Sequence, residues 1–345
     1  MRKTVYELCL KFRMDCAELL YDGASFYNKN IVDHLRITTD SIRITFERMR
    51  TAHPEEYVYS ERSTIRFQLY RAACYYLIVT GSLPEVETVT LTWPGGAAEL
   101  DKNLLINHWE HCDISVCWPR ETAARCFSEN GRITYIVMTY CLKAQLDLFS
   151  HDAFRAAWSA LNGVYNHLTE KDYESDKLDA LKKLLKNTEL PETEKYTKTL
   201  DDEFWRHLQW YNYAQKTGFK LLESRVLGDA YKDRMIYQNL SRYLCAEYKK
   251  IEPQRVKEIT TKTEKKAKTK EHQPREQIIF LVTDYCYMLR NRSFHAAKPY
   301  PIFFMKPSDR ETEEQKLTKL LLLTIRDLMN QGCEESRGRF SLTHF

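Results

Sequence analysis

Glycine and proline are scarce in this chain, and their scarcity constrains the fold more than any other feature. Only 10 glycines and 10 prolines occur among 345 residues, about half of the roughly 12% that the two residues reach together in average proteins. Because these residues form most tight turns, we expect a predominantly helical chain. Phosphate-binding glycine loops are also excluded, since no G-x-G-x-x-G or G-x-x-x-x-G-K motif is present. Dinucleotide-binding enzymes and P-loop NTPases are excluded with them.

The first third of the chain is expected to be a helical domain. Two stretches, 1–21 and 30–51, carry apolar residues at helical spacing. The residues that form this pattern are Val5, Leu8, Cys9, Phe12, Cys16, Leu19, Leu20, Ile31, Leu35, Ile42, Phe46 and Met49. A third helix is predicted from Ser60 to Thr80, with Gly81 as its C-cap. The β-branched segments Val86–Trp93 and Ile114–Trp118 predict a small β-containing connector over 82–120.

Helical patterns dominate the remainder, so the chain is predicted to be all-α apart from that connector. Apolar periodicity predicts helices over 133–149, 153–168, 202–247, 274–290 and 313–332, with Pro274 in a first turn. The charged residues 171–200 are expected to be dynamic. Residues 249–275 hold ten Lys or Arg against four Glu, and such a composition predicts a mobile basic loop. We therefore predict an N-terminal domain over 1–125 and a helical domain over 126–345.

Charge and cysteine content indicate the surroundings of the protein. The net charge is only +4, so any nucleic-acid surface must arise from local asymmetry. The N-terminus is too charged for a signal peptide, and no apolar run is long enough to cross a membrane. Ten cysteines without a C-x-x-C pair suggest free thiols in a reducing cytoplasm.

One short motif carries chemistry that glycine loops do not supply. Arg290 and His295 lie five residues apart, and a helix that ended near Arg290 would let a turn bring both side chains together. Pro299 and Pro301 favour such an ending. A histidine can move the protons of RNA cleavage, and a guanidinium can stabilise the phosphorane that forms. Alone, this spacing is weak evidence, because it occurs by chance in many chains.

The surrounding sequence resembles the HEPN superfamily of helical ribonuclease and RNA-binding domains, over about 131–331. Their signature is R-(N/D/H)-x3-H, and Arg290, Asn291 and His295 occupy its three places. Upstream, residues 153–167 are similar to the first long helix of the Apea-like branch. The positions that carry this likeness are Trp158, Ala160, Leu161, Asn162 and Tyr165. The chain departs from the branch by having Ala296 where glycine usually follows the histidine.

The resemblance implies a metal-independent endoribonuclease that acts as a homodimer, with two Arg–His pairs at the dimer axis. His295 would be the general acid or base, Arg290 would stabilise the phosphorane, and Asn291 would support them or cap the helix. Many relatives are toxins or antiviral effectors. No cofactor is expected. Residues 1–125 resemble no family and would be a sensor or recognition module for a regulatory protein or ligand.

Several residues could serve this activity or have ordinary structural roles. Asn162, Trp158 and Tyr165 would support the site; the alternatives are that Asn162 only bonds a backbone carbonyl and that Trp158 packs in the core. Candidate RNA contacts are Arg292, Lys262, Lys265, Lys266 and Tyr287. No metal site is expected, since the cluster from His108 to Cys117 lacks zinc spacing and Asp201–Glu203 suits a helix N-terminus. The alternatives are a non-catalytic RNA-binding module and a protein-interaction scaffold.

Overall fold

The computed structural model describes residues 3–14, 16–106, 112–147, 150–169, 173–295 and 312–335. These residues divide into two compact units. The first lies within Met1–His167 together with Met329–Phe345, and the second lies within Leu168–Leu328.

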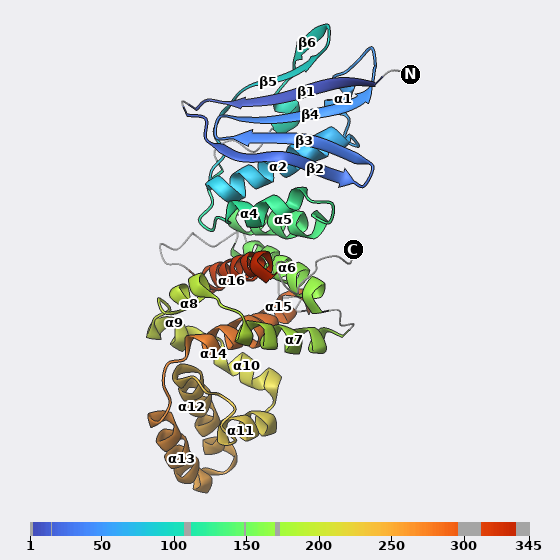
Figure 1. Ribbon diagram of the computed structural model, residues 1–345. Coiled ribbons are helices and arrows are strands. Elements are labelled where there is room, and N and C mark those ends of the chain that lie inside the picture. Colours follow the sequence, from blue (N-terminus) through green and yellow to red (C-terminus); the bar gives the residue numbers. More distant parts are fainter. Residues whose placement is uncertain are drawn as a thin grey trace. The chain divides into compact units, whose positions relative to one another are not determined.

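The first unit is built on a six-stranded antiparallel sheet, so the expectation of an all-α chain is wrong (Figure 1). The strands pair in the order β2-β3-β4-β1-β5-β6. Their bounds are β1 Lys3–Phe12, β2 Leu19–Asn28, β3 Ile31–Thr38, β4 Ser41–Met49, β5 Val86–Trp93 and β6 Gly96–Glu99. The helices expected at 1–21 and 30–51 are therefore replaced by strands, and β1 pairs with β4 and β5 rather than with β2. The strand expected at Val86–Trp93 is confirmed, whereas Ile114–Trp118 forms no strand.

Alternation of side chains explains why these segments are strands. In β1, Tyr6, Leu8, Leu10 and Phe12 are buried, while the residues between them are exposed or half-buried. A period of two places all four side chains on one face of a strand. The same period buries Ile42, Ile44 and Phe46 in β4. A half-buried sheet therefore replaces the predicted helical domain.

Helix α2 (Thr64–Thr80) covers the buried face of this sheet (Figure 1). The Ser63 hydroxyl caps its first turn by accepting from Ile65 N and Arg66 N. Gly81 ends it with φ at 88°, a left-handed conformation that suits glycine. This helix and its C-cap confirm the prediction. The other helices that begin in this unit are α1 Glu56–Tyr59, α3 Asn103–Ile106, α4 Arg120–Ala124, α5 Arg132–Leu146 and α6 Ser150–Thr169.

The second unit is helical throughout its described residues. Its helices are α7 Glu174–Asn187, α8 Pro191–Thr197, α9 Asp202–His207, α10 Trp210–Thr217, α11 Phe219–Leu227, α12 Arg234–Ile251, α13 Val256–Lys268, α14 Pro274–Ile279, α15 Cys286–His295 and α16 Glu313–Glu335, whose last residues belong to the first unit. A π-helical segment, Phe280–Tyr285, joins α14 to α15. Stacked aromatic rings form its core, with the rings of Trp210 and Phe280 5.5 Å apart.

Two segments expected to be mobile are helical here. In 171–200, α7 buries Leu178, Leu181 and Leu185. Their spacing of three and four residues places them on one narrow apolar face of the helix, although the segment is highly charged. In 249–275, α12 continues to Ile251 and α13 packs against it, so the prediction of a loop is wrong. Pro274 does open a helix, as expected.

Candidate functional site

The predicted catalytic motif lies on a long helical segment that runs from Pro274 through the π-helical turn to His295. Its first half is fixed in the core, because Tyr285, Cys286 and Met288 are almost completely buried. The Tyr285 hydroxyl accepts from Gln209 N at 2.6 Å and donates to Glu313 Oε1 at 2.5 Å. The segment that carries the motif is therefore anchored on more than one side.

Arg290 and Asn291 are in contact at the far end of this segment. Arg290 Nη1 donates a hydrogen bond to Asn291 Oδ1 at 2.9 Å, and both residues are half-buried. This bond restricts the position of the guanidinium, which carries five N–H donors in all. Asn291 is not a helix cap, since α15 continues beyond it, and its support of a catalytic Arg290 stays a prediction.

The expectation that the helix ends near Arg290 is wrong, because α15 continues to His295. The side chains of Arg292 and His295 lie outside the described residues, so their contacts remain predictions. On a continuous helix, residues five apart are separated by about 140° around the axis and about 7.5 Å along it. A turn at Arg290 therefore does not bring Arg290 and His295 of one chain together.

Lys216, which the sequence did not single out, adds a second cation near the motif. Its ammonium lies 4.4 Å from the centre of the Tyr287 ring. Burial lowers the pKa of Lys216, and the positive charge of Arg290 lowers it further, although Asp284 opposes the shift. Tyr287 is half-buried under this cation, whereas Tyr285 points into the core. The helical periodicity of 210–217 in the sequence did not indicate that Lys216 would lie beside Tyr287.

The three predicted supporting residues belong to α6 in the first unit. The Tyr165 hydroxyl donates to Asn162 Oδ1, and the rings of Trp158 and Tyr165 are 6.5 Å apart in an edge-on arrangement. Trp158 and Tyr165 are buried and Asn162 is half-buried. They form a local cluster, and their support of the motif stays a prediction.

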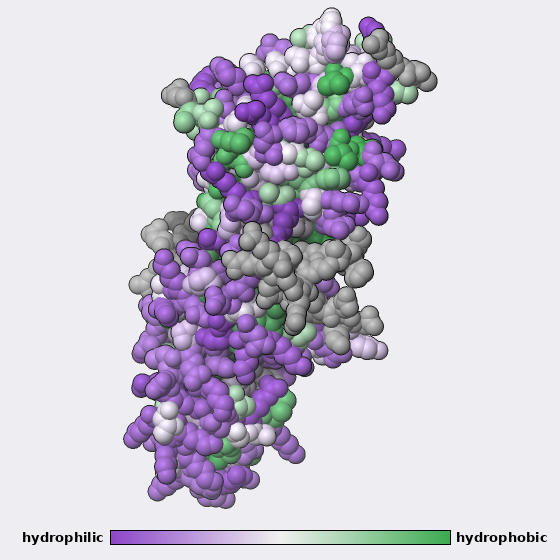
Figure 2. Space-filling model, in the orientation of Figure 1, coloured by the Kyte–Doolittle hydropathy of each residue, from purple (hydrophilic) through white to green (hydrophobic). Residues whose placement is uncertain are grey.

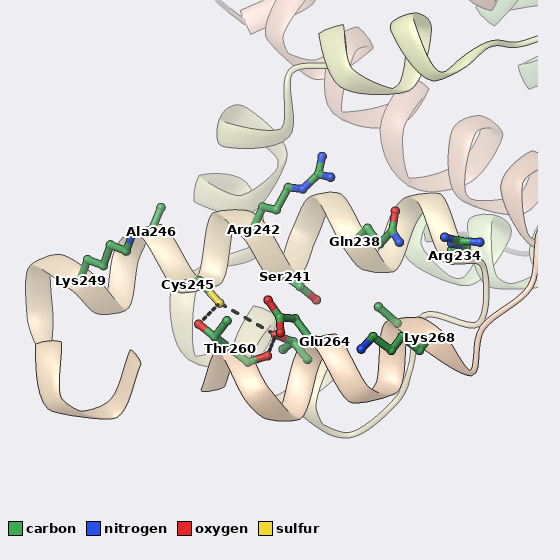
Figure 3. Close-up of a pocket in the computed structure, with 12 residues that line it drawn as sticks. Arg234, Gln238, Ser241, Arg242, Cys245, Ala246, Lys249, Thr260, Glu264 and Lys268 are labelled. Carbon is green, nitrogen blue, oxygen red and sulfur yellow. Dashed lines mark hydrogen bonds between the residues drawn. The ribbon is translucent and has the colours of Figure 1, made fainter. Parts of the chain in front are cut away.

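A second candidate site is a pocket between α12 and α13, with a volume of about 580 Å³ (Figure 3). Four cationic residues line it, together with one carboxylate. These are Arg234, Arg242, Lys249, Lys268 and Glu264. The surface over this hairpin is predominantly hydrophilic on the face shown in Figure 2.

The predicted lysines are not the ones that line this pocket. Lys262 forms an ion pair with Glu258 at 2.6 Å, Lys266 donates to the Leu227 carbonyl at 2.5 Å, and Lys265 is exposed. Two of the three already have structural partners. Arg234 and Arg242 lie before the basic segment in the sequence, and their positions along one sector of α12 were the signal that could have revealed them.

The four pocket cations differ from neighbouring cations in their pairing. Within the part of the chain that the structure describes, none of the four forms a salt bridge, whereas Lys250, Arg255 and Lys262 each do. Unpaired cations grouped in a concave site create a local positive potential. The net charge of +4 does not reveal this concentration.

Metal and membrane sites receive no support from the described residues. No group of three or more His, Cys, Asp or Glu among them is placed to hold a metal ion, and none of their helices is long and apolar enough to cross a membrane. His108 and His111 lie outside the described residues. Asp201 caps α9 by accepting from Phe204 N, which confirms the helix N-terminus expected there.

No family model, curated protein or solved structure matches the chain. The resemblance to HEPN domains therefore stays a prediction that rests on the residues quoted for it.

Proposed function

We propose that this protein is a metal-independent endoribonuclease whose reactive groups are Arg290 and His295. The observation that carries the proposal is the Arg290–Asn291 hydrogen bond at the end of a helix anchored in the core. A guanidinium held in place before the reaction stabilises the developing charge of a phosphorane without reorganisation. Lys216 adds positive potential in the same area.

The reaction would be an in-line transesterification. His295 would take the proton of the ribose 2′-hydroxyl, whose oxygen attacks the adjacent phosphorus. The 5′-oxygen would leave with a proton from a second acid, giving a 2′,3′-cyclic phosphate and a 5′-hydroxyl. Two proton transfers on opposite faces suit two histidines, and a dimer would supply the second.

Substitution of His295 tests the activity. His295→Ala should lower the rate of RNA cleavage by about 10²- to 10⁴-fold, the usual loss for a general acid or base, while EDTA leaves wild-type cleavage unchanged. Labelled single-stranded RNA would report the products. His272→Ala, at an exposed histidine of the same unit, is the matched control. Wild-type cleavage by a folded His295→Ala protein would refute the proposal.

Mixing wild-type and His295→Ala chains tests whether the site is composite. If the His295 side chains of both chains act on one phosphodiester, only dimers of two wild-type chains can cleave. An equal mixture should then keep about a quarter of the activity of the same amount of wild-type protein after subunit exchange, shown by mass spectrometry. Retention of about half of the activity would mean that each site belongs to one chain.

A non-catalytic RNA-binding module is the second candidate function. The observation that favours it is the pocket between α12 and α13, where four cations lack salt bridges among the described residues. Salt-dependent RNA binding without cleavage by the wild-type protein would support this alternative over the ribonuclease.

A further inference from the structure

We propose that the pocket between α12 and α13 binds the backbone of single-stranded RNA, separately from the α15 motif. This inference rests on the proposed function only in taking RNA as the ligand. It does not require that the chain cleaves RNA, because the pocket residues are distinct from Arg290, Asn291 and His295.

The arrangement of the cations favours an extended anion. Arg234, Arg242 and Lys249 lie on α12, and the helical rise spreads them over about 22 Å within a sector of about 80°. Lys268 of α13 lies at the same end as Arg234, with Lys249 at the other end (Figure 3). A compact anion cannot contact both ends of such a row. A nucleic-acid strand can, because its charges repeat along its length.

Both helices contribute hydroxyl groups to the pocket. Thr260 Oγ1 donates to Cys245 Sγ at 3.5 Å, which links the two helices. Ser241 is only 6% exposed and lines the same wall of α12. Hydroxyl groups can donate to phosphate oxygens as well as accept from sugar hydroxyls. The pocket therefore offers neutral contacts between its charged ends.

The one carboxylate indicates which nucleic acid fits. Glu264 lies between the two charged ends (Figure 3), where it would repel a phosphate but could accept a hydrogen bond from a sugar. The ribose 2′-hydroxyl is the donor that distinguishes RNA from DNA. We therefore expect phosphates at the two ends of the pocket and a ribose near Glu264.

Two variants of equal charge test the pocket, each in full-length His295→Ala protein so that RNA stays intact. The pocket variant combines Arg234→Gln, Arg242→Gln, Lys249→Gln and Lys268→Gln. The control combines Lys220→Gln, Lys232→Gln, Lys250→Gln and Lys257→Gln, exposed cations of the same unit that neither line the pocket nor are candidate RNA contacts. Circular dichroism and thermal melting verify that both variants are folded.

Fluorescence anisotropy with a labelled single-stranded 12-nucleotide RNA should show at least tenfold weaker binding by the pocket variant and less than threefold by the control. The slope of log K against log salt should fall by about 3, at roughly 0.7 per lost phosphate contact. Equal weakening by both variants, or none by the pocket variant, would overturn the pocket assignment alone. No RNA binding by the parent protein would overturn the proposed function as well.

Glu264→Gln tests the sugar contact. The parent should bind RNA more tightly than DNA of the same sequence, and this ratio should fall at least threefold in Glu264→Gln. An unchanged ratio, or equal binding of both strands by the parent, would show that Glu264 does not read the 2′-hydroxyl.

Discussion

The exposed face of the N-terminal sheet and the pocket between α12 and α13 both carry many charges, but they use them differently. On the sheet, Lys3 and Glu47 are 3.3 Å apart, Arg43 and Glu7 are 3.3 Å apart, and Lys11 lies 3.1 Å from Glu87. Each pair joins neighbouring strands. In the pocket, four cations lack such partners among the described residues.

The difference shows that the attraction of a charged surface for anions depends on whether its cations are paired with carboxylates, and not on the number of charged residues alone. Opposite charges on neighbouring strands cancel each other at a distance, and exposed pairs of this kind contribute little stability. Like charges across a pocket reinforce each other and attract anions. A chain of net charge +4 can therefore have a neutral face in one unit and a cationic site in the other.

The largest expected effect concerns the paired side of this comparison, where one pair is buried. Asp33 is 2% exposed and accepts from Arg48 Nη1 at 2.9 Å and Nη2 at 3.2 Å. Asp33→Ala should lower the free energy of unfolding by about 3–5 kcal/mol, because it leaves the charge of the Arg48 guanidinium without its anionic partner in a partly buried site. Urea denaturation measures the change.

The control for that experiment is an exposed pair in the same sheet. Asp22 lies 3.1 Å from His34 Nε2, and both side chains are well exposed. Asp22→Ala should change the unfolding free energy by less than about 1 kcal/mol. If the two variants were equally mild, burial would not be what makes the Asp33 pair important.

The N-terminal sheet could not be predicted from the spacing of apolar residues and the glycine content, for two physical reasons. Val5, Leu8 and Phe12 satisfy helical spacing, yet Leu8, Leu10 and Phe12 also satisfy the period of a strand, and only long-range pairing selects between them. The scarcity of glycine also led to the wrong prediction of a helical N-terminal domain. The turn between β2 and β3 uses Asn28, whose Oδ1 accepts from Asn30 N and Ile31 N, so this hairpin needs no glycine.

The pocket between α12 and α13 was not predicted from the sequence. The composition of 249–275 is basic, but it led to the wrong prediction of a loop, because α13 buries so little: only Ile259 and Thr263 are buried in it. The pocket arises from contact between two helices, and Arg234 and Arg242 come from the first of them. Composition within one window cannot reveal a site whose residues lie on both sides of the window boundary.

A smaller effect on stability is expected in the second unit, where the carboxylate of Glu313 is buried beside a neutral partner instead of a cation. Glu313 accepts from the Tyr285 hydroxyl, and burial raises its pKa although this hydrogen bond opposes the shift. The folded state therefore holds the proton more tightly than the unfolded state does. The stability that this proton contributes is complete below the ordinary pKa of 4.5 and is lost as pH rises through the folded value.

Glu313→Gln should consequently stabilise the protein at pH 7, by about 0.5–2 kcal/mol, the usual range for a stabilising substitution. The amide keeps an oxygen that can accept from Tyr285 and removes the buried charge. This gain should vanish below pH 4.5, where the wild-type carboxyl is protonated in both states.

Denaturation at several pH values measures the difference, and Glu271→Gln, at an exposed position, is the control. A gain that persisted unchanged in acid would mean that packing, and not charge, limits stability at Glu313. An exposed carboxylate beside a cation, such as Glu47, should show no such gain, because it has not lost its solvation.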